Sequence, residues 1–245
     1  MDLTEDDVAA IYDVTDPWRA EPGTSDALYT EFAMSAQSVL DVGCGTGQML
    51  HCLRDNGYTG RLAGIDPDAA SLRRAQRRAD IAVEWVEGTA ADIPWKQEFE
   101  VATMANNAFQ CLIEDDEVRA SLTAIRGALT DGGRFLFETR HPQARAWEDW
   151  AAAEPRRLDF AGRVLVMSWE IESAVDGVVT MIETTSQEDG TVLHVGRDRL
   201  RFLDLPTLNA WLEDAGFVVE EQYGDFRRGP ITSDSRSIVT IARTA

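Results

Sequence analysis

The stretch VLDVGCGTG, from Val39 to Gly47, decides the fold of this chain. An apolar run ends there in glycines at positions 43, 45 and 47, and a helical pattern begins directly afterwards. Glycines permit positive φ angles and carry no Cβ, so the backbone can approach a ligand that lies across the ends of parallel strands. The stretch therefore predicts a buried strand, a ligand-binding loop and a helix.

Outward from this loop, short apolar runs alternate with helical patterns. Strands are expected at 38–42, 62–66, 83–88, 100–105 and 134–139, with helices at 48–57, 69–79 and 114–129. Alternation of this kind is typical of an α/β fold, in which helices cover both faces of a parallel sheet. A helix at 205–216 and strands at 217–224 and 237–243 are expected to complete the sheet.

Two further regions extend the pattern. Residues 1–35 hold helical patterns that begin near Thr4 and Ser25. After Arg140 the alternation of strands and helices ends, and strands are expected at 163–174, 177–187 and 191–203. They are separated by Asp-Gly dipeptides, which favour hairpin turns. We expect residues 1–245 to form one domain, with an N-terminal helical lid at 1–35 and an antiparallel insertion at 141–204. Within it, 142–159 is compatible with loop or helix.

The composition excludes several classes of partner. The chain has 23 Lys plus Arg against 43 Asp plus Glu, a formal net charge of -20, which repels nucleic acid and anionic membranes. Its three cysteines lack paired spacing or a neighbouring His cluster, so neither a disulfide framework nor a metal site is expected. The first residues do not resemble a signal peptide, and no run approaches the length of a membrane helix. We expect a cytoplasmic protein, with a homo-oligomer left open.

Asp41 and Asp66 indicate the kind of ligand. Asp66 ends the second predicted strand, where a carboxylate can accept both hydroxyls of a ribose, as in NAD-binding folds. Those folds space their glycines G-x-G-x-x-G, whereas this chain has D-x-G-x-G-x-G. A carboxylate at Asp41 would repel a pyrophosphate but tolerate the amino group of a methionine moiety. An NAD-dependent oxidoreductase is therefore the less favoured alternative.

The run D-x-G-x-G-x-G, met at Asp41, Gly43, Gly45 and Gly47, closely resembles motif I of the class I S-adenosylmethionine-dependent methyltransferases of bacterial small-molecule type. The resemblance extends over most of the chain. It implies a Rossmann-like seven-stranded sheet whose final strand is antiparallel, with S-adenosylmethionine at the carboxyl ends of the first strands. It places Asp41 and the backbone from Gly43 through Cys44 to Gly45 at the methionine part. Asp66 then faces the ribose and Pro67 the adenine.

Two later segments continue the resemblance. EGTAADIP, at 87–94, is similar to the family's G-D-A-x-x-L-P stretch, which makes Thr89, Ala90 and Asp92 cofactor candidates. Thr89 replaces the usual Asp, and Asp92 is equally suited to capping a turn. VATMANNAFQCL, at 101–112, resembles the fourth-strand segment, with a role at the cofactor for Met104 and Asn106.

Asn107 stands in that segment where many related enzymes carry a His. An amide takes no proton at neutral pH, although it can orient an acceptor, and its alternative role is to satisfy loop backbone. His141 is then the general-base candidate by residue type, although a His before Pro more often marks a solvated loop.

The acceptor and the lid are expected to draw on other residues. Arg140 and Arg145 are candidates to bind an acceptor carboxylate, or else pair with neighbouring acids, and Tyr223 is a candidate lining residue. Tyr12 and Arg19 fall where related enzymes fold a lid over the cofactor, with Arg19 available to the methionine carboxylate. The strands at 163–203 and the loop after Arg140 are expected to cover the methyl group.

The resulting hypothesis is an enzyme that methylates a small organic molecule. In-line transfer from a sulfonium depends mainly on positioning and on exclusion of water, so a strong base is optional. The departures at Thr89 and Asn107 keep a second alternative open, a regulatory or scaffold protein that binds S-adenosylmethionine without turnover.

Overall fold

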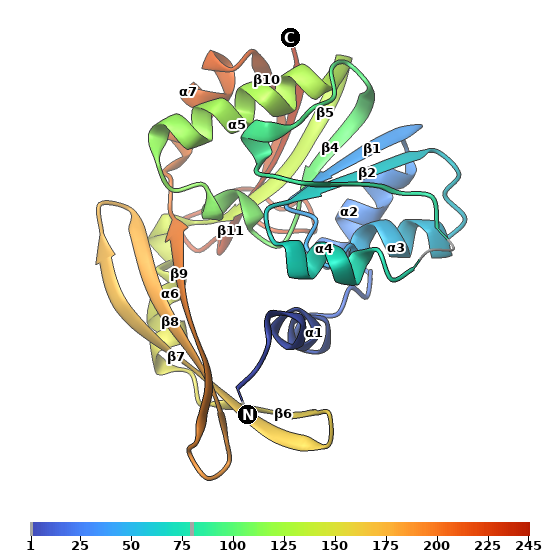
Figure 1. Cartoon of the computed structure of the whole chain (residues 1–245). Coiled ribbons are helices and arrows are strands. Elements are labelled where there is room, and N and C mark those ends of the chain that lie inside the picture. Colours follow the sequence, from blue (N-terminus) through green and yellow to red (C-terminus); the bar gives the residue numbers. More distant parts are fainter. Residues whose placement is uncertain (1, 79–80) are drawn as a thin grey trace.

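The main sheet of the computed structural model, which describes residues 2–78 and 81–245, has seven strands in the order β10-β11-β5-β4-β1-β2-β3 (Figure 1). Its strands are β1 (Ser38–Val42), β2 (Arg61–Asp66), β3 (Glu84–Glu87), β4 (Phe99–Met104), β5 (Leu129–Arg140), β10 (Phe217–Tyr223) and β11 (Ser237–Thr244). The first five pair in parallel, whereas β11 is antiparallel to both of its neighbours. The predicted α/β sheet with an antiparallel final strand is confirmed.

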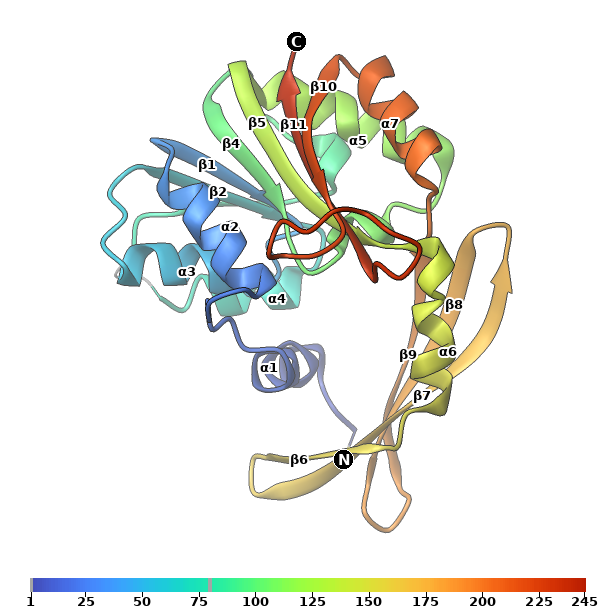
Figure 2. The ribbon, with the colours of Figure 1, turned by 180° about the vertical axis from the view of Figure 1, so that it is seen from behind.

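Helices cover both faces of this sheet, as Figures 1 and 2 show. One face carries α2 (Ser25–Met34), α3 (Gln48–Asp55) and α4 (Ala69–Ala75), and the other carries α5 (Asp115–Ala128) and α7 (Leu205–Asp214). Consecutive residues of β1 alternate between the two cores, Val39 facing α3 and Leu40 facing α5, as the pleat of a strand requires. Helix α4 ends earlier than predicted, and Ala79 lies outside the described residues. No helix in the described ranges is long and apolar enough to cross a membrane.

The insertion forms a separate four-stranded antiparallel sheet, here called the small sheet. Its strands are β6 (Arg156–Phe160), β7 (Arg163–Val175), β8 (Val178–Gln187) and β9 (Val192–Arg201), hydrogen-bonded in that order. Asp176 and Gly177 both have positive φ, as the predicted hairpin turn requires. The segment for which the sequence allows loop or helix contains the 3-10 helix η3 (Pro142–Ala144), α6 (Ala146–Ala152) and most of β6. Strand β6 is not predicted by the sequence pattern.

Helix α1 (Glu5–Thr15) lies between the main domain and the small sheet (Figures 1 and 2). Its Ile11 is buried against Leu165 and Met167 of β7 and Leu193 of β9. The preceding Leu3 donates its backbone N–H to the Leu193 carbonyl at 3.1 Å. The N-terminal segment is therefore packed on the insertion as well as on the main domain.

Gly47 fixes how closely α3 approaches the sheet. A Cβ built at this position would lie 2.5 Å from Cη2 of Trp85 on β3 and 3.1 Å from the Ala75 Cβ. The φ of Gly47 is +75°, in the region that favours glycine. The third glycine of the motif is thus a packing residue between helix and strand.

We predict that Gly47→Ala lowers the free energy of unfolding by about 3 kcal/mol, because it combines left-handed strain with a clash against Trp85. Gly57→Ala is the matched control, since Gly57 has a φ of +82° but nothing within 4 Å of its added Cβ. That control is expected to cost about 1 kcal/mol. Urea denaturation measures both, and equal losses would contradict the packing role.

Candidate functional site

A cavity of about 450 Å³ opens at the carboxyl ends of β1, β2 and β4. This is the point of the sheet at which the strand order reverses, where ligands of open α/β folds bind. Most of the predicted cofactor residues line it: Tyr12, Asp41, Gly43, Cys44, Gly45, Asp66, Pro67, Thr89, Ala90, Met104 and Asn106. Three do not, namely Arg19, Gly47 and Asp92. The fold thus brings residues from five separate segments to one place.

The glycine loop is held to β2 by its own amides. Gly43 donates its N–H to the Ile65 carbonyl at 2.8 Å, and Gly45 donates to Asp66 Oδ2 at 2.7 Å. A Cβ added at Gly45 would meet nothing within 4 Å, so this stretch of backbone faces open space. The loop therefore leaves room for a ligand to approach main-chain atoms, as a bound S-adenosylmethionine requires.

Two buried carboxyl groups give this cavity its electrostatic character. Asp41 is 3% exposed and accepts a hydrogen bond from Thr103 Oγ1 at 2.9 Å, and its burial raises its pKa to about 7. Burial also raises the pKa of Asp66, whose Oδ1 accepts from the Asp68 N–H at 2.8 Å. Neither carboxyl has an ion-pair partner among the described residues. The donor set of an amino group and ribose hydroxyls fits these acceptors, whereas a phosphate would be repelled.

The lid helix α1 reaches the cavity through Tyr12. The Tyr12 hydroxyl accepts from Asn106 Nδ2 at 3.1 Å and donates to Asp16 Oδ2 at 3.3 Å. Burial raises the pKa of Tyr12 to about 12, so the phenol stays neutral. Tyr12 and Asn106 therefore close one side of the cavity together.

Asp13, on the same helix, attaches the lid to the glycine loop itself. Its carboxylate accepts a hydrogen bond from the Thr46 hydroxyl and pairs with Arg74 of α4. Both members of that ion pair are largely shielded from solvent, with side-chain exposures of 22% and 29%. Attractions between such charges are screened less than those at the open surface.

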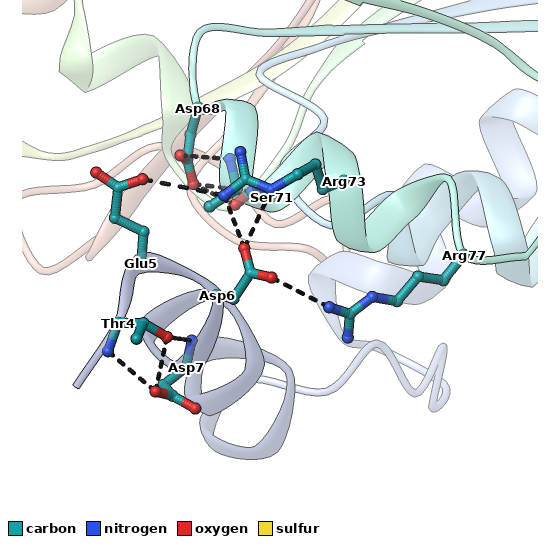
Figure 3. A network of polar contacts seen from close by, with 9 residues as sticks. Thr4, Glu5, Asp6, Asp7, Asp68, Ser71, Arg73 and Arg77 are labelled. Carbon is teal, nitrogen blue, oxygen red and sulfur yellow. Dashed lines mark hydrogen bonds and ion pairs between the residues drawn. The ribbon is translucent and has the colours of Figure 1, made fainter.

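A more exposed network joins the start of α1 to α4, as Figure 3 shows. The Asp6 carboxylate pairs with Arg73 at 2.7 Å and with Arg77 at 3.2 Å. Thr4 and Asp7 cap α1 reciprocally, which aligns its first turn. Exposed ion pairs of this kind each contribute little.

Three predicted cofactor residues make other contacts and do not line this cavity. Asp92 accepts from the Thr89 N–H at 3.0 Å and from its hydroxyl at 2.6 Å, which caps the 3-10 helix η1 (Ala90–Asp92). Arg19 donates its N–H to Asp26 Oδ2 at 2.8 Å and lies outside the cavity lining. Gly47 packs against Trp85, as described above. The capping alternative for Asp92 is therefore the one that the geometry favours.

Several residues that line the cavity were not among the predicted site residues, for example Trp18, Thr46, Gln48, Ser71, Cys111 and Leu112. Gln48 accepts from the Trp18 N–H at 2.8 Å and donates to the Asp16 carbonyl at 3.1 Å, which ties the start of α3 to the lid. Its position directly after the last glycine of the motif could have identified Gln48 as a lining residue. No sequence feature could have identified Trp18, because its position depends on contacts with residues far along the chain.

A second cavity, of about 780 Å³, adjoins the first and shares Asn106 with it. It lies beyond the end of β5, between α6 and the loop at 224–237. Its lining includes Ser25, Asn107, Glu138, Arg140, Ala146, Trp150, Asp225, Asp234 and Arg236. Of the predicted acceptor residues, Arg140 and Asn107 are here. Arg140 donates to Gln110 Oε1 at 3.0 Å, and its guanidinium lies 4.8 Å from the Trp150 ring centre.

Glu138 is the most deeply buried charged group of this second cavity, at 1% exposed. It accepts hydrogen bonds from the Tyr29 hydroxyl and, at 2.8 Å, from the Asn107 N–H. The sequence pattern gives no sign of this pair, because Tyr29 and Glu138 lie 109 positions apart. Only the folded chain brings them together.

Three predicted residues lie outside both linings. His141 is 8% exposed, and its Nδ1 accepts from the Gln143 N–H at 3.1 Å, so the imidazole caps η3. Arg145 pairs with Glu148 at 3.2 Å on the surface, and the Tyr223 hydroxyl donates to Glu221. None of the three borders either cavity, so their predicted roles at the acceptor stay predictions.

The small sheet also differs from expectation. Among the residues that the structure describes, none from β6 to β9 lines either cavity. The apolar residues Leu165 and Met167 pack on Ile11 of α1 instead. Of the predicted covering region, only the segment just after β5, with Ala146 and Trp150, borders the second cavity.

Comparison with known proteins agrees with this geometry. Residues 39–133 match a family model described as a methyltransferase domain. Cypemycin N-terminal methyltransferase from Streptomyces sp is 25% identical over 212 residues, which cover 85% of this chain and 83% of that protein. The chain thus resembles the class I S-adenosylmethionine-dependent methyltransferases in its fold and, over residues 39–133, in its sequence.

Two further matches support this methyltransferase assignment. A 2-phytyl-1,4-naphtoquinone methyltransferase from Thermosynechococcus vestitus is 31% identical over 118 residues, covering 46% of this chain and 51% of that protein. A crystal structure of an S-adenosylmethionine-dependent methyltransferase from Clostridium acetobutylicum superimposes with a TM-score of 0.78 at 16% identity, covering 97% and 98% of the two chains. The protein is an enzyme, and S-adenosylmethionine is its cofactor.

We predict that Gly45→Val weakens S-adenosylmethionine binding at least 100-fold, because the new side chain would project into the space beside the loop backbone. Gly132→Val is the matched control, since Gly132 also has positive φ and nothing within 4 Å but lies outside the first cavity. Calorimetry on both variants measures the difference. Equal affinity in the two would show that the glycine loop does not contact the cofactor.

We predict further that Asp13→Ala raises the dissociation constant of S-adenosylmethionine about tenfold, because it releases the lid from the glycine loop and from α4. Asp6→Ala removes only the exposed network of Figure 3 and should change this constant by less than about threefold. Stopped-flow fluorescence gives the dissociation rates. A reversed order of the two effects would mean that the Asp13 contacts do not hold the lid.

Proposed function

We propose that the protein transfers the methyl group of S-adenosylmethionine to a small organic molecule bound in the second cavity. The observation that supports this most directly is that the two cavities meet at Asn106. The second cavity is large enough for a compound of drug-like size and is bordered by convergent polar groups from four segments. The acidic charge of the chain also disfavours a nucleic acid acceptor.

The relatives named above act on chemically different acceptors. One is named for the N-terminus of cypemycin and the other for a naphthoquinone. Both names support a defined organic acceptor. Because they differ in chemistry, the acceptor of this chain has to be argued from its own site. A cytoplasmic location and the existence of a homo-oligomer stay predictions.

The residues of the chain would contribute binding and orientation. S-adenosylmethionine, when bound, supplies a methyl group already activated on a sulfonium. Asp66 would hold the ribose hydroxyls, and Asp41 with the glycine loop would hold the methionine part. Tyr12 and Asn106, joined by their hydrogen bond, would exclude water from the junction of the cavities. Positioning across that junction is the main catalytic contribution that such a site offers.

The function is tested by incubating the protein with S-adenosylmethionine carrying a carbon-13 methyl group. The low-molecular-weight fraction and the protein fraction of a bacterial lysate are supplied separately, and labelled products are found by mass spectrometry. We expect label in a small molecule. Label only in protein, or no label in either fraction while cofactor binding is intact, would contradict the proposed function.

We predict that Ser25→Trp raises the KM for that acceptor at least tenfold, because the indole would occupy part of the second cavity. Ser35→Trp is the matched control, since it places the same side chain on exposed surface just after the same helix. Both variants should bind S-adenosylmethionine as the unaltered protein does. An unchanged KM for Ser25→Trp would mean that the acceptor binds elsewhere.

A further inference from the structure

The second cavity contains a buried carboxyl group that forms no ion pair in the described residues, although the charge of Arg140 lowers its pKa. Glu138 is 1% exposed, and within the described residues no Lys, Arg or His forms an ion pair with it. Arg140, two positions along, is turned to Gln110 and Trp150. A buried carboxylate without a cation is costly, and proteins retain such groups mainly where they serve a function.

The hydrogen bonds of Glu138 fix its orientation and leave it able to accept more. Tyr29, on α2, donates its hydroxyl to Oε2, and the Asn107 N–H donates to Oε1 at 2.8 Å. Each carboxylate oxygen has a further lone-pair direction. Beside it, the side-chain oxygen of Asn107 is buried and has no hydrogen-bond partner. Acceptor oxygens are therefore gathered here in excess of donors.

This excess selects among acceptor chemistries. A ligand carboxylate would be repelled by Glu138, and a neutral alcohol would bring no charge to balance it. An alcohol is also far too weak an acid to lose its proton to a carboxylate. An ammonium group supplies both the missing positive charge and several donors, and its acidity lies within reach of a buried carboxylate.

We propose that the methyl acceptor is an amine, which binds as its ammonium form against Glu138 and passes its proton to that carboxylate. This inference rests on the proposed function, since it requires the acceptor to occupy the second cavity. Glu138 is then a catalytic residue. Tyr29 is a positioning residue, which acts by holding the carboxylate.

The chemistry balances without any further reactant. One ammonium N–H bond breaks, its proton goes to a Glu138 oxygen, and its electron pair becomes the nitrogen lone pair. That lone pair forms a bond to the methyl carbon while the carbon–sulfur bond breaks and its electrons remain on sulfur. The products are a methylated amine and S-adenosylhomocysteine, and the proton on Glu138 then passes to solvent.

The pH dependence of this step follows from the surroundings of Glu138. Burial raises its pKa to about 7, and the Tyr29 hydrogen bond, the Asn107 N–H and the charge of Arg140 oppose that rise. The other charged groups that border the same cavity are Arg140, Asp225, Asp234 and Arg236. The charge of Asp41, on β1, raises the pKa of Tyr29. Because the base works only when deprotonated, kcat/KM should fall as the pH drops through about 7.

The first test identifies the atom that receives the label. The product formed from carbon-13 S-adenosylmethionine and the low-molecular-weight fraction is analysed by carbon NMR, which distinguishes N-methyl from O-methyl and C-methyl groups. We expect an N-methyl product. An O-methyl or C-methyl product would overturn the amine inference while the proposed function stood, whereas absence of any small-molecule product would remove the proposed function itself.

The second test uses variants on that amine. Glu138→Gln should lower kcat/KM at pH 8 by about 100-fold or more and abolish the acid limb near pH 7. In Tyr29→Phe, kcat/KM should still fall toward acid pH, but the fall should occur at a higher pH. The lost hydrogen bond had favoured the charged carboxylate, so its removal raises the pKa of Glu138. Both should bind S-adenosylmethionine within about threefold of the unaltered protein, and circular dichroism confirms that they fold.

A purely structural role for the pair would give a different result. It would reduce the rate equally at every pH and leave the acid limb where it is. An unchanged limb in Glu138→Gln, or a limb moved to lower pH in Tyr29→Phe, would therefore overturn the inference.

Discussion

The site depends on the hydrogen bond between the Gly45 N–H and the Asp66 carboxylate. It joins the loop after β1 to the end of β2, while the Gly43 amide makes the parallel connection to Ile65. The loop can adopt this course because its glycines have positive φ. One short contact thus sets both the shape of the cofactor loop and the orientation of the carboxylate beside it.

Two buried carboxyl groups are the second feature that defines the site. Asp41 and Glu138 each end up fully enclosed near the carboxyl ends of their strands, and each has its pKa raised to about 7 by that burial. Hydrogen bonds from protein groups stabilise the charged forms of both, and the charge of Arg140 adds to them at Glu138. Two carboxyl groups of this acidic protein are therefore shielded from water. One borders each of the two cavities that share Asn106.

The parts of the fold that local pattern determines could be predicted from the sequence. VLDVGCGTG specifies a strand, a glycine loop and a helix through residues adjacent in the chain, and Asp66 follows at the end of the next strand. Strand β6 was missed because its turn, Ala161-Gly162, lacks the Asn or Asp that marks a hairpin, and because two arginines begin it.

The parts of the site that depend on long-range contacts could not be predicted. Tyr29 has the helical spacing of an ordinary core residue, yet its hydroxyl contacts Glu138, which lies 109 positions along the chain. His141 has the right chemistry for a base, but the path of the chain turns its Nδ1 toward the Gln143 amide. Residue type indicates what a side chain can do, whereas its neighbours in space determine what it does.

Helix α1 packs against two bodies at once. Its Asp13 is bound to the main domain, and its Ile11 is enclosed by β7 and β9 of the small sheet. Any movement of α1 away from α4 must therefore either expose Ile11 to water or carry the small sheet along. Opening of the first cavity by such a movement would thus be coupled to the small sheet through Ile11, although no strand of that sheet in the described structure lines either cavity.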